Sequence, residues 1–284
     1  GHLFRLHDTD IHIIILCGMS AVFASLFGTP IAAAVFSMEV ITVGVMHYSA
    51  FVPCIVSSSI AYGITQKYGV INTLYPQIFI PEFSIYLFLK VILLSIFCGL
   101  ISIIFCISMH QSGSFFQKYF PNDYGRIFTG GCLIAALTFF LGTRAYNGQG
   151  TEMIQLAFTG TCPTFAFLFK ILFTAITLGT GFKGGEIVPS LFVGATFGNI
   201  IAPFLGLDPI LGAAIGFIAL FCGVVNCPLA ALLLSVELFG HQALLLFCIV
   251  CAVSYVFSGY YGLYSSQKIM YDKLHPKYIN TNSL

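Results

Sequence analysis

A glycine-rich loop that leads into an apolar helix is the part of the sequence best suited to chemistry. The stretch Gly179–Pro189 reads Gly-Thr-Gly-Phe-Lys-Gly-Gly-Glu-Ile-Val-Pro, and an apolar run follows it to about Leu205. Glycines let the chain bend, and the free N–H groups and dipole of a helix start attract anions. Such partial charges can hold an ion that must also leave. We therefore predict an anion site from Gly185 to Val188, against the alternative of a flexible loop before an ordinary helix.

Glu186 is the ionisable side chain within this predicted site, and two interpretations of it stay open. A carboxylate at membrane depth beside an anion path suits a proton carrier. Equally, a carboxylate at a helix start is stabilised by the helix dipole and then has a structural role alone.

Other motifs indicate little further chemistry. Cys248 and Cys251 form a C-x-x-C inside the apolar run Leu244–Val253, which favours buried free thiols over a metal or redox site. The sequence has no His-Glu-x-x-His, no Gly-x-Ser-x-Gly and no paired Asp in its apolar runs, so we predict no catalytic residues, metal or cofactor. The spacing of Gly194 and Gly198 is typical of helix packing.

An internal repeat relates two distant segments. Residues 29–39 and 227–237 share Pro, Ser and Glu at a constant offset of 198 residues. Because Pro is tolerated in the first helical turn, each segment suits a short helix that begins at its Pro. Glu39 and Glu237 then lie near the helix ends, and we expect them to bind backbone there. Repeats in an apolar chain are typical of transporters.

The composition shows which solvent surrounds these elements. Of the 284 residues, 58% are hydrophobic and 7% are charged, whereas soluble domains carry about 25% charged residues. The chain is therefore predicted to be a multi-pass protein of a prokaryotic plasma membrane, surrounded by lipid. A net charge of +1 without a basic patch argues against binding to nucleic acid.

The apolar runs are short and are interrupted by Gly and Pro. Part-crossing helices are tolerated where protein or a watery cavity surrounds them, which favours a transporter or channel. The runs are Ile11–Phe27, Pro30–Val45, Phe51–Ile64, Ile85–Met109, Ile127–Leu141, Thr164–Leu178, Ile187–Leu205, Ile210–Val225, Pro228–Leu238 and Ala243–Phe257.

We expect one transmembrane domain over residues 1–276, with repeat segments near 11–40 and 209–239, and a polar tail over 277–284. Polar connections are expected at Gln66–Glu82, His110–Arg126 and Gly142–Glu152. Basic residues concentrate in the His110–Arg126 connection and in the tail, which places both in the cytoplasm.

Three segments resemble one known family in its own order. Gly184–Pro189, followed by Leu191–Ala195, resembles the third signature of the CLC chloride channels and anion/proton exchangers, roughly Gly-Gly-x-Phe-x-Pro. Arg5–Glu39 resembles the segment after the second signature, and Gly262–Ser265 resembles the family's tyrosine region. The resemblance extends over about residues 1–272.

This resemblance implies an all-α fold with many tilted and broken helices, an antiparallel internal repeat, and a homodimer with one pore in each subunit. It also implies that an anion is bound by the backbone N–H groups of Glu186 and Ile187 and by the hydroxyl of Tyr264. The alternative for Tyr264 is an ordinary tyrosine at the membrane interface.

The sequence departs from the family at several places. The first signature and the gating glutamate would precede Gly1, so we expect the chain to be a fragment that lacks its N-terminal part. Val40 stands where proton-coupled chloride exchangers have an internal glutamate. Glu186 resembles the fluoride/proton branch, although Val188 stands where that branch tends to have Thr.

These observations favour transport of chloride or fluoride in exchange for protons. A passive chloride channel is the first alternative, which Val40 permits. A cation-coupled solute symporter and a non-functional fragment are the others.

Overall fold

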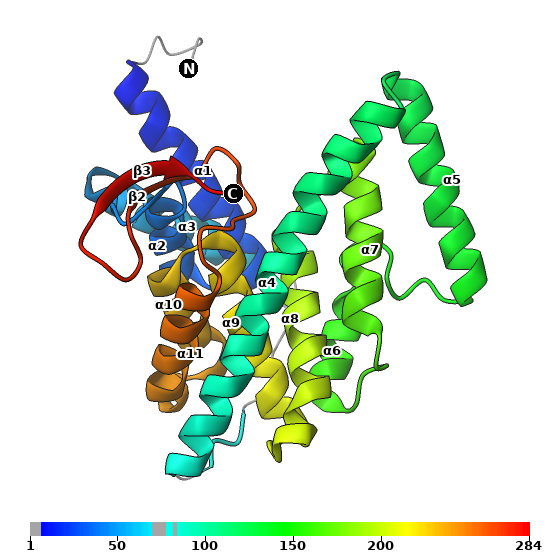
Figure 1. Ribbon diagram of the computed structural model, residues 1–284. Coiled ribbons are helices and arrows are strands. Elements are labelled where there is room, and N and C mark those ends of the chain that lie inside the picture. The colour runs from blue at the N-terminus through cyan, green and yellow to red at the C-terminus, as the bar shows by residue number, and fades with distance from the viewer. Residues whose placement is uncertain (1–6, 70–77, 82–83) are drawn as a thin grey trace.

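Helices make up most of the structure, which is a computed structural model and describes residues 7–69, 78–81 and 84–284 (Figure 1). The α-helices in this part of the chain are α1 (Asp8–Phe27), α2 (Pro30–Glu39), α3 (Phe51–Lys67), α4 (Ile85–Tyr119), α5 (Asp123–Leu141), α6 (Thr151–Thr159), α7 (Ala166–Gly179), α8 (Ile187–Ile201), α9 (Pro209–Val225), α10 (Pro228–Phe239) and α11 (Leu244–Phe257). Three short strands join them: β1 (Thr42–Val43), β2 (Lys268–Tyr271) and β3 (Tyr278–Asn282). The predicted helical membrane fold is thus confirmed.

The predicted apolar runs coincide with helices, but one predicted connection was wrong. The expected connection His110–Arg126 is mostly helical, because α4 continues to Tyr119 and α5 begins at Asp123. Its polar residues extend helices beyond the apolar segment and do not end them. The expected connection Gly142–Glu152 is confirmed up to its last two residues, where α6 begins at Thr151. The Gln66–Glu82 connection lies largely outside the described residues.

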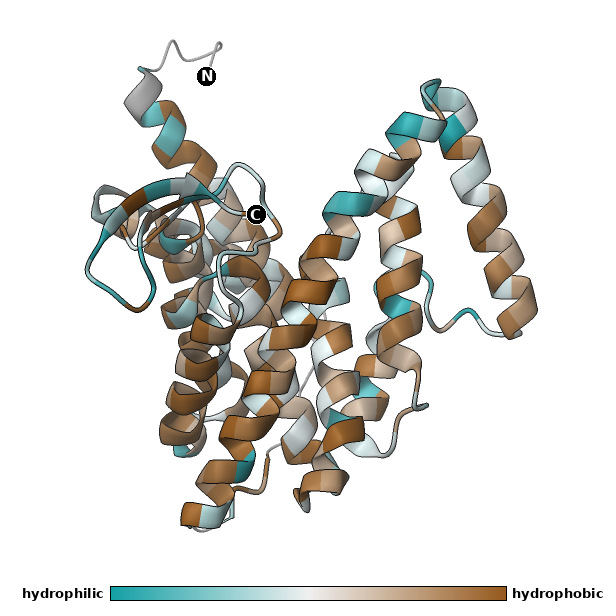
Figure 2. Cartoon of the chain, in the orientation of Figure 1, coloured by the Kyte–Doolittle hydropathy of each residue, from teal (hydrophilic) through white to brown (hydrophobic). Residues whose placement is uncertain are grey.

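Five described helices are long and apolar enough to cross a membrane, and several shorter apolar helices accompany them. Hydrophobic residues make up most of the helices, while hydrophilic residues gather where α4 meets α5 and along the C-terminal strands (Figure 2). These two hydrophilic regions lie toward the same end of the molecule in Figure 1. That both face the cytoplasm stays a prediction.

Helices α8 and α9 form the centre of the fold and touch through glycines. A Cβ atom added to Gly194 would lie 2.3 Å from the Gly216 carbonyl oxygen, and one added to Gly198 would lie 2.0 Å from the Gly212 oxygen. Any side chain at these positions would push the two helices apart. Close packing of helices in membranes therefore requires small residues here. The packing role predicted for Gly194 and Gly198 is confirmed.

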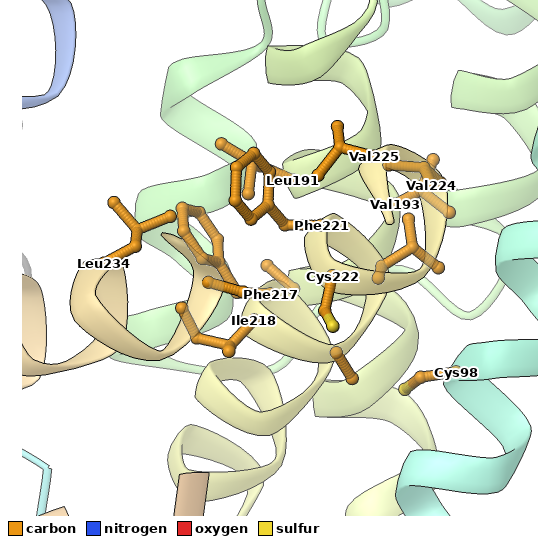
Figure 3. Packing of buried hydrophobic residues seen from close by; sticks show 14 of the residues in the cluster. Cys98, Leu191, Val193, Phe217, Ile218, Phe221, Cys222, Val224, Val225 and Leu234 are labelled. Atoms are coloured by element: carbon orange, nitrogen blue, oxygen red, sulfur yellow. The ribbon is translucent and has the colours of Figure 1, made fainter. Parts of the chain in front are cut away.

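Helix α9 is buried on all sides. Every residue from Leu211 to Val225 is buried, and its side chains pack between those of neighbouring helices, such as Leu191 of α8 and Leu234 of α10 (Figure 3). A helix that is apolar all round has no face for water, so α9 serves as the axis of the core.

The internal repeat appears as a reciprocal contact between α2 and α10. The carboxylate of Glu237, near the end of α10, accepts hydrogen bonds from the Ile31 and Ala32 N–H groups at the start of α2 (3.0 and 2.7 Å). Glu39, at the end of α2, accepts the equivalent bonds from the start of α10 (3.2 and 2.8 Å). The expected binding to backbone is confirmed, and each glutamate caps the other repeat's helix.

The C-terminal residues form a small sheet in place of a simple polar tail. Strand β1, which follows α2, pairs in parallel with β2, and β2 pairs antiparallel with β3. Residues 277–284 were expected as a tail, yet Tyr278–Asn282 is the outer strand of this sheet. The sheet therefore ties the C-terminal segment to the end of α2.

We predict that Gly198→Ala destabilises the protein by about 1–3 kcal/mol, because the new methyl group overlaps the Gly212 backbone. Gly113→Ala in α4 is the matched control, since its Cβ would meet no atom within 4 Å, and helix propensity favours Ala. Thermal unfolding in detergent, followed by circular dichroism, measures both. Equal midpoints for the two variants would contradict the close packing.

We also predict that Glu237→Ala lowers the free energy of unfolding by about 1–2 kcal/mol, because two N–H groups of α2 lose a charged acceptor. Glu39→Ala should cost more, since Glu39 is only 7% exposed. Glu152→Ala, at an exposed position, is the control. The same unfolding assay compares the three, and a loss no larger than that of Glu152→Ala would exclude the reciprocal caps.

Candidate functional site

The loop between α7 and α8 presents an open helix start. Helix α7 ends at Gly179, and the chain turns at Gly181 with a φ of 102°, which a residue with a side chain rarely adopts. Helix α8 begins at Ile187 with Glu186 at its N-cap, and no described side chain caps it. The first bond of its ladder is donated by the Ser190 N–H to the Glu186 carbonyl (3.1 Å). The preceding N–H groups have no acceptor within the helix.

This helix start and Tyr264 face the same cavity. A cavity of about 750 Å³ is lined by Gly184–Val188, by Leu263–Ser266 and by apolar side chains of α1 and α2. The five residues predicted from the sequence thus come together, although Tyr264 lies far from the others along the chain. That they bind an anion stays a prediction.

Glu186 is partly buried at the edge of this cavity. The salt bridge found among the described residues joins Arg126 to Asp123, so the Glu186 carboxylate is not paired with a described Lys or Arg. The described lining of the cavity likewise contains no Lys or Arg. Positive charge is supplied there by backbone dipoles.

The segment that carries Tyr264 is fastened to the end of α9. Asn226, which ends α9 in the left-handed conformation (φ 57°), donates from its Nδ2 to the Tyr261 carbonyl (2.9 Å). The Leu263 N–H donates to the Val224 carbonyl (2.9 Å). On the other side, the Ser283 hydroxyl donates to the Tyr264 carbonyl (2.8 Å). The tyrosine backbone is therefore held from two directions.

A buried polar cluster behind this segment satisfies the carbonyl ends of three helices. Gln267 donates from Nε2 to the carbonyls of Val40, after α2, and Val225, at the end of α9 (2.7 and 2.8 Å). The Lys273 ammonium donates to Asn226 Oδ1 (2.6 Å), and it also binds acceptors at the end of α11. Cations and amide donors suit these negative helix ends. Sequence analysis missed this cluster, because its members are isolated polar residues far apart along the chain.

A second cavity, of about 470 Å³, lies against the same loop and contains a buried lysine. Lys170 of α7 is 1% exposed, and its ammonium donates to the carbonyls of Tyr146 and Gly148 (3.2 and 2.6 Å). It also lies 5.0 Å from the centroid of the Phe192 ring. Sequence analysis did not single out Lys170, although a lysine within an apolar run was a usable signal.

The structure also locates other features that the sequence analysis considered. Cys248 and Cys251 are free thiols on α11. No group of metal-ligating side chains occurs among the described residues. Of the segments that carry the family resemblance, residues 1–6 lie outside the described part of the chain.

Comparison with known proteins is consistent across sequence and structure. A family model described as voltage gated chloride channel matches residues 1–259. The chain is 38% identical over 280 residues to the "Chloride/fluoride channel protein" of Pseudomonas syringae, covering 96% of this chain and 62% of that protein. It is 26% identical to the "H(+)/Cl(-) exchange transporter ClcA" of Vibrio cholerae, covering 89% and 58%.

Solved structures agree. The crystal structure of a CLC-type fluoride/proton antiporter matches with a TM-score of 0.87 and 31% identity, covering 90% of this chain and 65% of that one. A slow cyanobacterial Cl⁻/H⁺ antiporter matches with a TM-score of 0.73 and 22% identity, covering 91% and 64%, which shows the fold alone. The chain thus spans less than two thirds of the length of these proteins.

Proposed function

The chain belongs to the voltage gated chloride channel family, and we propose that its complete protein carries fluoride or chloride across a membrane in exchange for protons. The observation that carries this proposal is the cavity where the open start of α8 and Tyr264 meet. The names of the relatives, which include a chloride/fluoride channel protein and a fluoride/proton antiporter, support the same activity.

The geometry suits a halide that binds and then leaves. The free N–H groups of Glu186 and Ile187 and the Tyr264 hydroxyl are donors that can replace part of an ion's hydration shell. Because the described cavity lining has no Lys or Arg, the ion meets partial charges and no full salt bridge. Binding of this strength permits passage along the path.

Glu186 is the proposed proton carrier. Val40 offers no carboxylate at the position that the family resemblance assigns to an internal proton glutamate. The adjacent residue Glu39 is already engaged, because both of its carboxylate oxygens accept hydrogen bonds from N–H groups of α10. Glu186 is the acidic side chain that lines the cavity. This arrangement supports the fluoride/proton branch over the chloride/proton branch.

A passive channel is the second candidate. Val40 favours it, since loss of an internal glutamate removes one route for protons, and the Pseudomonas relative is named as a channel protein. The two candidates differ in whether an anion gradient drives protons uphill.

We further propose that two copies associate in the lipid bilayer, each with its own path. The family resemblance implies this dimer, and apolar side chains such as Val52 (66% exposed) and Leu245 (75% exposed) lie open on the helical surface. Size-exclusion chromatography with light scattering in detergent is expected to give twice the protein mass of one copy. A single-copy mass at all protein concentrations would contradict the dimer.

For the complete protein in liposomes, we predict that a fluoride or chloride gradient drives protons and that Glu186→Ile abolishes the proton movement while anions still pass. The reason is that Ile keeps an aliphatic side chain at the helix start but cannot bind a proton. Paired recordings with an anion electrode and a pH indicator measure both fluxes. Glu152→Gln is the control, because Glu152 also lies in a first helical turn but is exposed.

Three results of this assay are decisive. Unchanged coupling in Glu186→Ile would make Glu186 structural. Anion flux without proton flux in the parent protein would establish the channel. The absence of anion flux in the parent protein would overturn transport itself.

We also predict that Tyr264→Phe weakens halide binding roughly 10- to 100-fold, because a hydrogen bond to a charged partner contributes about 1.5–3 kcal/mol. Isothermal titration of the purified protein with fluoride and with chloride measures this change. Tyr278→Phe, on the exposed outer strand, is the matched control. If both variants bind halide as the parent does, the Tyr264 hydroxyl does not contact the ion.

A further inference from the structure

One face of α4 is packed against α9 and α11 and reaches, at His110, the segment that carries Tyr264. Gly99, Ser102, Cys106 and His110 recur at helical spacing and so share this face. At Gly99 an added Cβ would lie 3.0 Å from the Cβ of Phe257, at the end of α11. The Ser102 side chain lies close against Gly223 of α9. His110 continues the same line toward the loop after α11.

His110 makes a direct bond to this loop. Its Nε2 lies 2.8 Å from the carbonyl oxygen of Gly262. A carbonyl only accepts, so Nε2 carries the hydrogen. The site is tight, because a Cβ on Gly262 would lie 2.9 Å from Asn226 Nδ2. A shift of the Gly262 carbonyl is therefore passed on to Tyr264, two residues later.

We propose that His110 is a positioning residue of the anion site, which fixes Tyr264 through the Gly262 carbonyl and thereby strengthens halide binding. This inference rests on the proposed function, since it assumes that Tyr264 contacts the anion.

Its physical basis is the hydrogen bond from the His110 Nε2–H to the Gly262 carbonyl, which ties α4 to the backbone that carries Tyr264. A donor that is already held in place loses less conformational freedom when it binds an ion. His110 would thus raise halide affinity from outside the cavity.

Two substitutions test this bond in the complete protein. His110→Gln keeps an N–H donor near the Nε2 position, whereas His110→Ala removes it. His241→Ala, at an exposed histidine remote in sequence, is the matched control. Isothermal titration with sodium fluoride and sodium chloride gives the halide affinity of each protein.

We expect His110→Ala to weaken halide binding about 3- to 10-fold, as loss of a single hydrogen bond does. His110→Gln should bind as the parent does. In a Tyr264→Phe background, His110→Ala should have little further effect, because both changes act through one side chain. Parent-like affinity of His110→Ala would overturn the proposal.

Amide hydrogen exchange tests the positioning without any ligand. Exchange at residues 262–267 should be faster in His110→Ala and restored in His110→Gln. Identical protection in all four proteins would refute the positioning role even if transport were intact. If instead the parent binds neither halide while exchange still depends on His110, the proposed function fails, the halide part of this inference fails with it, and the positioning remains established.

Discussion

An open helix start inside an apolar protein is the constraint on which the rest of the structure depends. Free N–H groups are costly away from water, so helix starts in such a setting are normally satisfied. Three apolar helices here follow that rule: Asp208 caps α9 with bonds of 3.1 Å to two N–H groups, and Glu39 and Glu237 cap α10 and α2. Helix α8 does not follow it, since no described side chain caps its start, which opens into the cavity beside Tyr264. The same attraction that binds a carboxylate elsewhere is left available to an ion.

Helix α9 sets the relative position of the two halves of the site, which are the start of α8 and the segment that carries Tyr264. On one side, its glycines let α8 approach so closely that the direction of the open helix start is fixed. At its end, the Val224 carbonyl and the Asn226 side chain hold the backbone that carries Tyr264. Because one buried helix sets both positions, the distance between the amide donors and the hydroxyl does not depend on the loops between them. Rigid support of this kind is what a site built from weak donors requires.

Sequence reasoning identified what is local and periodic. Apolar runs predict helices because lipid demands them, the glycine-rich stretch predicts the open start of α8, and the 198-residue offset predicts the paired helices α2 and α10. It could not assign the partner of Glu237, which binds a backbone more than 200 residues away. Nor could it find α6, which is short, or the cluster around Gln267 and Lys273. The Glu237 contact and this cluster form where helix ends meet in space. The spacing of residues along the chain does not predict such meetings.

The reciprocal caps also restrict where a proton can travel. A protonated carboxyl is a poorer acceptor for two N–H groups than a carboxylate, so a proton on Glu39 would weaken the start of α10, and one on Glu237 would weaken the start of α2. Each step of proton transfer through these residues would therefore loosen the contact between the repeats. The Glu186 side chain does not cap a helix, and it lines the cavity directly. A proton on Glu186 would therefore not weaken a helix start. The repeat thus uses its own glutamates to stabilise the fold, which is why we propose Glu186, beside the open helix, as the proton carrier.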